Sequence, residues 1–379
     1  MAQIKKIFII CGEPSGDLLA GNLAGEMLKL DPGIKFTGIG GKNLRDTGAE
    51  IIYDIGGLSV MGLLDVLKKL PRFLKLKRLV LERIKAEKPD AIIFVDFSGF
   101  NLRLAKALNK SIPAFYYVSP QVWASREKRI KRIKEFIDEM VVLFKFEEEF
   151  YRKRGIRAHF AGHPLADLSP RPLQRKQIME SLRLDPSKKV IALLPGSRKQ
   201  EIKAVLPLML KAGEIIEKNI PGMQFIIAKS AGVEKEVYED ACSRSSLLPR
   251  IAEGKTHECL ESADFCLVCS GTATLEAAIL QKPFLIVYKM GMLNYFFYRP
   301  QIKIPYIGIV NIVCGRKIVP EYIQFNACPE KIARNALALL NNPGLTMQML
   351  EELRRLKEVL GPPGAAERAA RIFLAFLNK

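Results

Sequence analysis

The chain of 379 residues is long enough for two or three domains, and 49% hydrophobic residues suit a globular protein with a sizeable core. A net charge of +19 favours an anionic partner: nucleic acid, acidic lipid or a phosphorylated metabolite. Seven scattered cysteines argue against a disulfide framework, and no apolar run reaches the ~18 residues of a membrane-spanning helix. We therefore expect a cytoplasmic protein that can touch a membrane without crossing it.

From the N-terminus onward, short apolar runs alternate with longer helical patterns. IFIIC, AIIFV and AFYYV fall within residues 7–118, and each is followed by a helical or basic stretch. The alternation resumes with VIALL, FIIAK, FCLVC and FLIVY between residues 190 and 288. This pattern is typical of βαβ units with parallel sheets, so the expected fold class is α/β.

A polar stretch with four prolines, residues 163–189, separates the two series and predicts a linker. We expect two Rossmann-like domains, at residues 1–165 and 187–355, that face a central cleft. Glycine and proline at 361–364 separate the tail, 365–379, from the preceding helical pattern. The tail is predicted to be a helix that either crosses back to the first domain or packs on a second subunit of a homodimer.

Ligands of open α/β sheets bind where the carboxyl ends of strands meet loops and helix N-termini. The first predicted strand runs into CGEPSGD, residues 11–17. Ser15 or Asp17 can cap a helix that begins near Leu18, which is the plain structural interpretation. Capping does not account for Glu13, Ser15 and Asp17 together, so all three are candidate substrate contacts.

Asp96 follows the apolar strand AIIFV, at the lip of the predicted cleft. As a cap for a helix expected from Leu102 it comes several residues early, and Asn101 is better placed for that role. A carboxylate at a cleft-facing strand end can take the proton of a substrate hydroxyl. Asp96 is therefore the candidate general base.

The loop PGSR follows the first predicted strand of the second domain. Gly196 and Ser197 form a short turn before Arg198, whose guanidinium and the neighbouring N–H groups can bind a diphosphate without a metal. The alternative is a surface arginine in a turn, and the Walker pattern is absent from the sequence.

A second loop of the same domain, Ser270 and Gly271, ends a predicted strand and starts a helix near Thr272. The free N–H groups of a helix N-terminus suit phosphate. Glu276, one turn later, can accept hydrogen bonds from a ribose diol. Taken alone, this loop and Glu276 indicate only a favourable helix N-terminus. Together with PGSR in the same domain, they predict a nucleotide-diphosphate site.

Residues 60–88 hold nine basic and three acidic residues interleaved with leucines, and Pro71 is expected to break the stretch. The default interpretation is an amphipathic helix packed on its own domain. The sharper one is an interfacial segment on anionic lipid, at ~1 kcal/mol per basic residue near the surface. The side chains expected to face the membrane are Met61, Leu63, Leu64, Leu67, Phe73 and Leu74.

Two of three further features have a structural interpretation, and packing alone does not explain the third. Cys266 and Cys269 share a strand-like run, where their side chains point opposite ways, so we interpret them as buried thiols. The chain has only three histidines and no obvious ligand set, so no metal is expected, and His163 is interpreted as structural. Asn311 and Arg316 lie among glycine and proline, which predicts a loop over the cleft.

Taken together, several motifs resemble the lipid-A-disaccharide synthases, in the same order and over nearly the whole chain. They are GEPSGD, GIGG, SVMGLLDVLKKLP, YVSPQVWASR, FAGHPLAD, LLPGSR, SGTATLE and VNIVCGR. The resemblance implies an inverting GT-B glycosyltransferase on the cytoplasmic face of a Gram-negative inner membrane. It implies transfer from UDP-2,3-diacylglucosamine to 2,3-diacylglucosamine 1-phosphate, giving a β-1,6 disaccharide and UDP, without a cofactor.

The resemblance also implies roles for individual residues. Asp96 falls on the essential acid of the family, Arg198 on its PGSR arginine and Asn311 on its cleft-loop asparagine, which we place with the nucleotide-binding residues. Glu13, Ser15 and Asp17 would then line the acceptor side. The sequence departs from the family in two places: Phe-Ser-Gly at 97–99 replaces Ala-Pro-Asp, and Ser125 replaces tryptophan before an arginine.

Two alternatives remain open from the sequence. The first is a UDP-sugar 2-epimerase-like enzyme of the same fold, which would not need the basic amphipathic segment. The second is a nucleic-acid-binding protein driven by the net charge of +19. It ranks last, because the basic residues lie beside leucines rather than beside stacking aromatic residues.

Overall fold

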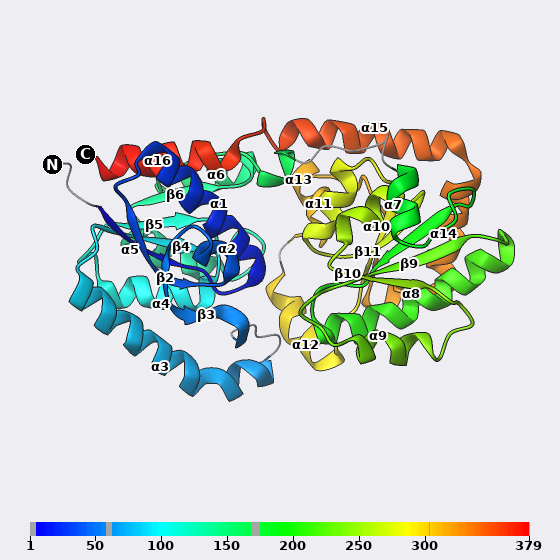
Figure 1. Ribbon diagram of the computed structural model, residues 1–379, viewed down its shortest axis with the longest axis horizontal. Helices are drawn as coiled ribbons and strands as arrows, with labels where there is room; N and C mark the ends of the chain where they lie inside the picture. Colours follow the sequence, from blue (N-terminus) through cyan, green and yellow to red (C-terminus); the bar gives the residue numbers. More distant parts are fainter. Residues whose placement is uncertain (1–4, 58–62, 168–174, 303, 379) are drawn as a thin grey trace. The chain divides into compact units, whose positions relative to one another are not determined.

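The computed structural model describes residues 5–57, 63–167, 175–302 and 304–378, with the backbone alone at residues 57, 63–70 and 298. The chain divides into two compact units, which Figure 1 shows as two sheets flanked by helices. Unit 1 comprises Met1–Asp167, Gln301–Lys303 and Leu360–Lys379, and unit 2 comprises Leu168–Pro300 and Ile304–Val359.

Unit 1 contains a seven-stranded parallel sheet in the order β3-β2-β1-β4-β5-β6-β7. All five residues of β4 are buried, as expected for a parallel strand covered on both faces. The strands are β1 (Lys6–Ile10), β2 (Lys35–Gly40), β3 (Glu50–Asp54), β4 (Ala91–Val95), β5 (Ala114–Tyr117), β6 (Glu139–Val142) and β7 (Ala158–Phe160).

Helices cover both faces of this sheet, with α1 and α16 on one side and α3 and α4 on the other (Figure 1). Pro71 lies within α3 and does not end it, so the predicted break is wrong. The helices are α1 (Pro14–Leu30), α2 (Lys42–Arg45), α3 (Leu63–Glu87), α4 (Ser98–Leu108), α5 (Ile130–Phe136), α6 (Lys145–Arg152) and α16 (Ala365–Leu377), with 3-10 turns η1 (Ile55–Gly57), η2 (Glu127–Arg129) and η3 (Pro164–Asp167).

Unit 2 contains a six-stranded parallel sheet in the order β10-β9-β8-β11-β12-β13. Its strands are β8 (Val190–Leu194), β9 (Gln224–Lys229), β10 (Arg250–Glu253), β11 (Phe265–Cys269), β12 (Phe284–Tyr288) and β13 (Glu321–Ile323). Its helices are α7 (Arg175–Ser181), α8 (Lys199–Asn219), α9 (Lys235–Cys242), α10 (Thr256–Ser262), α11 (Thr272–Ile279), α12 (Met292–Tyr298), α13 (Ile309–Cys314), α14 (Pro329–Asn341) and α15 (Pro343–Val359), with 3-10 turns η5 (Arg299–Gln301) and η6 (Gln324–Asn326). The predicted α/β class with two parallel sheets is confirmed.

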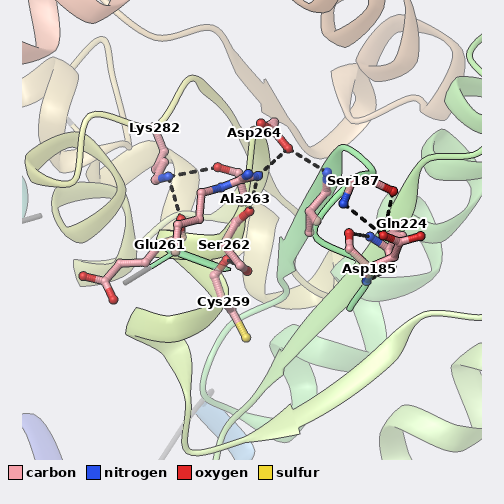
Figure 2. A network of polar contacts seen from close by, with 11 residues as sticks. Asp185, Ser187, Gln224, Cys259, Glu261, Ser262, Ala263, Asp264 and Lys282 are labelled. Atoms are coloured by element: carbon pink, nitrogen blue, oxygen red, sulfur yellow. Dashed lines mark hydrogen bonds and ion pairs between the residues drawn. The ribbon is translucent and has the colours of Figure 1, made fainter. Parts of the chain in front are cut away.

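A network of hydrogen bonds connects the segments at the amino ends of the unit 2 strands (Figure 2). Asp264, just before β11, accepts hydrogen bonds from the Val190 N–H at the start of β8 and from Arg175, each at 2.8 Å. Lys282 donates to the carbonyl oxygen of Glu261 at the C-terminus of α10, 2.9 Å away. This network lies at the end of the sheet opposite the PGSR and SGT loops, so we assign it to stability.

Each sheet has one point where the strand order reverses. In unit 1 it lies between β1 and β4, where Ile10 pairs with Phe94. In unit 2 it lies between β8 and β11, where Leu194 pairs with Val268. Loops that follow such neighbouring strands diverge to opposite faces and leave room for a ligand at the carboxyl edge. This places CGEPSGD beside Asp96, and PGSR beside SGT.

Helix α16 packs on unit 1 of its own chain, beside α1 (Figure 1). Its Phe373 is fully buried and stacks on Phe115, with ring centroids 5.4 Å apart. Arg368 donates to the carbonyl oxygen of Ala161 at 2.8 Å. Of the two alternatives for the tail, the structure therefore shows the helix that crosses back.

Two expected helix starts and one expected loop are wrong. α1 begins at Pro14 rather than near Leu18, because proline already has the φ of a first helical residue. α4 begins at Ser98 rather than Leu102, directly after a left-handed Phe97. The expected cleft loop around Asn311 contains a short helix, α13. None of the described helices has both the length and the apolar composition needed to span a membrane.

Candidate active site

Asp96 sits on a strained turn at the carboxyl end of β4. Both Asp96 and Phe97 have positive φ, 47° and 45°, a conformation that disfavours side-chain-bearing residues by about 1–3 kcal/mol each. The surrounding contacts hold this turn: the Asp96 carbonyl oxygen accepts hydrogen bonds from Asn101 Nδ2, at 2.9 Å, and from the Tyr116 hydroxyl. Asn101 is therefore a buried anchor of this turn and not the helix cap that we expected. Strain of this kind is typical of functional sites.

The aromatic ring of Phe97 lies directly over Gly12. A Cβ atom at Gly12 would lie 2.3 Å from Phe97 Cγ, so only glycine fits there. The same ring packs against Phe100, at 5.3 Å between centroids, and against Phe73, at 6.0 Å. Phe97 thus builds an aromatic cluster that joins the first loop to α3 and α4.

The three polar residues of CGEPSGD have different surroundings. Glu13 is half-buried at the N-cap of α1, and Ser15 is exposed in its first turn. Asp17 is only 2% exposed, and its carboxylate accepts hydrogen bonds from the N–H groups of Gly41 (2.6 Å) and Asn43 (2.9 Å). We expected Asp17 to contact the acceptor. Its carboxylate instead caps α2, because those buried N–H groups need a partner, and it holds the GIGG loop.

A buried carboxyl that sequence analysis missed anchors the loop after β5. Ser119 Oγ and Trp123 Nε1 donate to Glu147 Oε1, at 2.8 and 3.0 Å. Burial raises the pKa of Glu147 to about 7, and these hydrogen bonds oppose the rise. The run of three acids in KFEEEF could have pointed to Glu147. It did not, because acidic side chains on a helix are normally exposed to solvent. This carboxyl holds the YVSPQVWASR loop.

In unit 2, PGSR forms the expected turn between β8 and α8. Gly196 has φ +111°, and a Cβ atom there would lie 2.7 Å from Glu201 Oε2. Arg198 is the N-cap residue of α8 and forms an ion pair with Glu201, with Nη1 and Oε1 3.3 Å apart. Glu201 is nearly buried, so it orients a guanidinium that remains partly exposed.

The SGT loop lies beside PGSR, because β8 and β11 are neighbours in the sheet. Gly271 and Thr272 are exposed at the start of α11, and Ser270 Oγ donates to the carbonyl oxygen of Ile307 at 2.9 Å. Burial raises the pKa of Glu276, and its carboxylate lies 3.8 Å from His257 Nε2, which opposes the rise. These groups present N–H donors and one acceptor at a single edge.

Asn311, which we expected among the nucleotide-binding residues, is held by hydrogen bonds within unit 2. It is fully buried on α13, where its Nδ2 donates to the carbonyl of Val319 and to Glu321, each at 2.8 Å. Its Oδ1 accepts from the N–H groups of Ile318 and Val319. Glu321, which sequence analysis missed, also binds the Gly308 N–H at 2.9 Å. These four hydrogen bonds occupy the amide of Asn311.

The expected membrane-facing residues are described only in part. Met61 lies outside the described residues, as do the side chains of Leu63, Leu64 and Leu67. Leu74 is exposed, whereas Phe73 is half-buried in the aromatic cluster.

A second exposed apolar surface, missed by sequence analysis, lies on unit 2. We call it the α12 patch; its members are Met292, Leu293, Phe296, Phe297 and Phe325. Leu293 is 84% exposed and Phe296 63%, and Phe325 packs edge-on against Tyr295. The residues from Lys289 to Arg299 include no acid.

The two cysteines of β11 and His163 are buried within the fold. Cys266 and Cys269 are buried free thiols on β11, and burial raises the pKa of both. Burial lowers the pKa of His163 to about 4, and its Nδ1 accepts the Leu165 N–H. Across the described ranges no group of three or more His, Cys, Asp or Glu side chains is arranged to hold a metal.

The chain is similar to one family along almost its whole length. A family model described as lipid-A-disaccharide synthetase matches residues 7–368. A lipid-A-disaccharide synthase from Syntrophus aciditrophicus is 40% identical over 377 residues, 99% of this chain and 98% of the relative. Another from Geobacter metallireducens is 37% identical over 379 residues, 100% of this chain and 99% of the relative.

Solved structures share the fold at lower identity. A putative UDP-N-acetylglucosamine 2-epimerase from Listeria monocytogenes superposes with a TM-score of 0.63 at 16% identity, over 99% of this chain and 96% of that one. A glycotransferase of kitacinnamycin gives 0.64 at 16% identity, over 99% of both. An S. aureus MnaA–UDP co-structure gives 0.64 at 16%, over 99% and 97%. These likenesses show the two-sheet GT-B fold alone.

Proposed function

Because the chain belongs to the lipid-A-disaccharide synthetase family and is therefore a glycosyltransferase, we propose that it joins UDP-2,3-diacylglucosamine to 2,3-diacylglucosamine 1-phosphate. The products are the β-1,6-linked disaccharide 1-phosphate and UDP. One observation carries the proposal: polar groups lie where the strand order of each sheet reverses. In unit 1 this is a carboxylate on a strained turn, and in unit 2 it is two small-residue loops at helix N-termini.

Asp96 acts as the general base on the acceptor. The acceptor 6-hydroxyl oxygen forms a bond to the anomeric carbon of the donor, and its proton passes to the Asp96 carboxylate. The bond between the anomeric carbon and the UDP oxygen breaks, and UDP leaves with the electron pair. Attack from the face opposite to the leaving group inverts the anomeric centre.

The donor diphosphate binds to the two loops of unit 2. The Arg198 guanidinium, oriented by Glu201, and the N–H groups of Ser197 and Thr272 offset the negative charge that grows on the leaving UDP. Gly196 and Gly271 allow the backbone to approach the phosphates. These groups supply the neutralisation that a divalent ion gives other enzymes, so we expect full activity in EDTA.

The remaining site residues have supporting roles. Glu276 binds the ribose diol next to the SGT loop. Glu13 and Ser15, beside Asp96, contact the acceptor. Asp17 and Asn311 hold the GIGG loop and the segment next to Ser270, so they act through geometry rather than by contact with substrate.

We place the enzyme at an anionic membrane surface on the cytoplasmic side of the inner membrane, because both substrates carry two acyl chains. Between residues 71 and 88, α3 and its end expose Leu74 among seven basic residues. The α12 patch adds exposed aromatic rings between Lys289 and Arg299. Apolar and aromatic side chains beside basic ones suit the interface of an anionic bilayer.

A product assay tests the proposal. Purified protein with both substrates should form the disaccharide and one UDP per linkage, in EDTA as in buffer. Arg198→Ala should weaken UDP binding by about tenfold or more, whereas Lys199→Ala, an exposed neighbour paired with Glu234, should not. Unchanged UDP affinity in the arginine variant, or strict dependence on a divalent ion, would contradict the donor site.

The same assay distinguishes the transferase from the alternative, a UDP-sugar 2-epimerase-like enzyme. A putative epimerase from Listeria monocytogenes shares the fold. An epimerase changes the configuration of UDP-sugar without any acceptor. A transferase releases UDP only when the acceptor is present. Conversion of the UDP-sugar in the absence of acceptor would favour the epimerase.

A further inference from the structure

The carboxylate of Glu276, one turn into α11, makes few contacts with polar groups of the protein. Its side chain is 16% exposed, and burial raises its pKa. Across the described ranges, no N–H or O–H group donates a hydrogen bond to either carboxylate oxygen, and His257 is the one side chain that forms an ion pair with it. Polar groups as buried as this one are normally satisfied by hydrogen bonds. The lone pairs of this carboxylate are therefore available to a ligand that brings hydroxyl donors.

The fold brings His257 to this carboxylate from another helix. α10 begins at Thr256, just after the carboxyl end of β10, and packs against β9 and β8. β8 is the neighbour of β11 in the sheet, and α11 follows β11. The first turns of α10 and α11 therefore meet at one edge of the sheet. There His257 Nε2 lies 3.8 Å from Glu276 Oε2, and the histidine side chain is 40% exposed.

The distance and the exposure indicate how His257 acts. A separation of 3.8 Å is too long for a hydrogen bond, so His257 leaves the lone pairs of the carboxylate available. A partly exposed ion pair of this kind contributes little to stability. A protonated imidazole at this distance favours the ionised form of the carboxylate and opposes the effect of burial. The pair is therefore suited to present a charged acceptor to a ligand.

We propose that His257 is a positioning residue that holds the Glu276 carboxylate for the 2′- and 3′-hydroxyls of the donor ribose. This inference rests on the proposed function, in which Glu276 binds the ribose diol. The two oxygens of one carboxylate can accept from two adjacent hydroxyls, and hydrogen bonds to an ionised acceptor are about twice as strong as neutral ones. A deoxyribose would leave this charged group without donors. The pair therefore selects ribonucleotides over deoxyribonucleotides.

Binding of two nucleotides that differ only in the diol tests the proposal. UDP and 2′,3′-dideoxy-UDP are titrated into the protein by calorimetry at about pH 6, which favours a protonated imidazole. The wild type should bind UDP at least about tenfold more tightly. His257→Gln should reduce this ratio by about threefold or more, through weaker binding of UDP alone. His257→Arg keeps a cation and should restore the ratio.

Lys235→Gln is the matched control, because it removes an exposed cation of unit 2 that is paired with Glu239. It should alter neither affinity. Equal affinity of the wild type for both nucleotides would overturn the proposal. An equal loss of both affinities in His257→Gln would also overturn it, as would a ratio that this variant leaves unchanged.

A double-mutant cycle separates positioning from direct contact with the nucleotide. Because His257 acts through Glu276, His257→Gln should change UDP affinity no further when Glu276→Gln is already present. An additional loss of the same size in that background would show that His257 binds the nucleotide itself and would refute the positioning role. Thermal unfolding of each variant checks that it is folded.

These measurements need no acceptor, so they do not depend on the proposed reaction. A preference for the diol that depends on His257 supports the inference even if no disaccharide forms. Disaccharide formation together with a ratio that does not depend on His257 refutes the inference and leaves the proposed reaction in place.

Discussion

At the scale of single residues, the contact between Gly12 and Phe97 fixes the geometry of the turn that carries Asp96. Gly12→Ala places a methyl group where the Phe97 ring lies, 2.3 Å from Cγ, so the ring and the turn must move. We expect a lower midpoint of thermal unfolding and a loss of transfer.

Gly25→Ala is the matched control for that variant. A Cβ atom at Gly25, within α1, meets nothing within 4 Å, so this change should stabilise the protein by up to about 1 kcal/mol. Wild-type activity and stability in Gly12→Ala would show that the turn does not depend on this contact.

Glu147 gives a pH-dependent test, because burial raises its pKa from 4.5 to about 7. Between these values the folded protein retains a proton that the unfolded chain releases, so Glu147 lowers stability as pH rises towards 7. Glu147→Gln keeps an acceptor for Ser119 and Trp123 and removes the titration. Relative to wild type, the free energy of unfolding of this variant should gain on the order of 2–3 kcal/mol between about pH 5 and about pH 8.

Chemical unfolding at the two pH values measures that difference directly. A constant difference between the two proteins across the range would mean that Glu147 titrates normally in the folded state.

The sequence located the residues at strand ends well and their hydrogen-bond partners poorly. Asp96 and Arg198 follow apolar runs, so their positions at the sheet edges could be predicted. The partners of Asp17 lie 24 to 27 residues away, and those of Asn311, on α13, include Glu321 on β13. Whether a polar side chain faces a ligand or satisfies buried N–H groups depends on such tertiary contacts.

At the scale of elements, α16 completes the core of unit 1 from the far end of the chain. Phe373 is fully buried against Phe115 and Tyr117. Phe373→Ala should lower the free energy of unfolding by about 3–5 kcal/mol, whereas Leu345→Ala, at an exposed position on α15, should change it by less than about 0.5 kcal/mol. Denaturant unfolding of both variants decides the point, and a Phe373 variant as stable as wild type would show that α16 does not pack there.

The alternation of strands and helices was predictable, whereas helix starts were not. Apolar runs of four to six residues mark buried parallel strands in either unit. The start of α4 depends on Phe97, whose backbone is left-handed. Phenylalanine rarely adopts this conformation, so the sequence does not predict the helix start. The start of α1 at Pro14 follows the preference of proline for the first helical position, whereas the polar residues Ser15 and Asp17 favoured a later start.

At the scale of the whole molecule, the net charge of +19 and the α12 patch make a joint prediction about lipid surfaces. Binding to phosphatidylglycerol vesicles should exceed binding to phosphatidylcholine and should fall with salt. Leu293→Ser with Phe296→Ser should weaken binding by about tenfold or more. Leu248→Ser, at an isolated position that is 96% exposed, should not. Equal binding by the two variants in co-sedimentation would exclude the patch.

The central claim is that Asp96 removes the proton of the acceptor hydroxyl while unit 2 holds UDP. Asn tolerates the left-handed backbone of residue 96, so Asp96→Asn removes the base and keeps the turn. The decisive measurement compares this variant with wild type for disaccharide formation and for UDP affinity. We expect a loss of transfer of at least about a hundredfold with unchanged UDP affinity. Turnover near the wild-type rate would contradict the account.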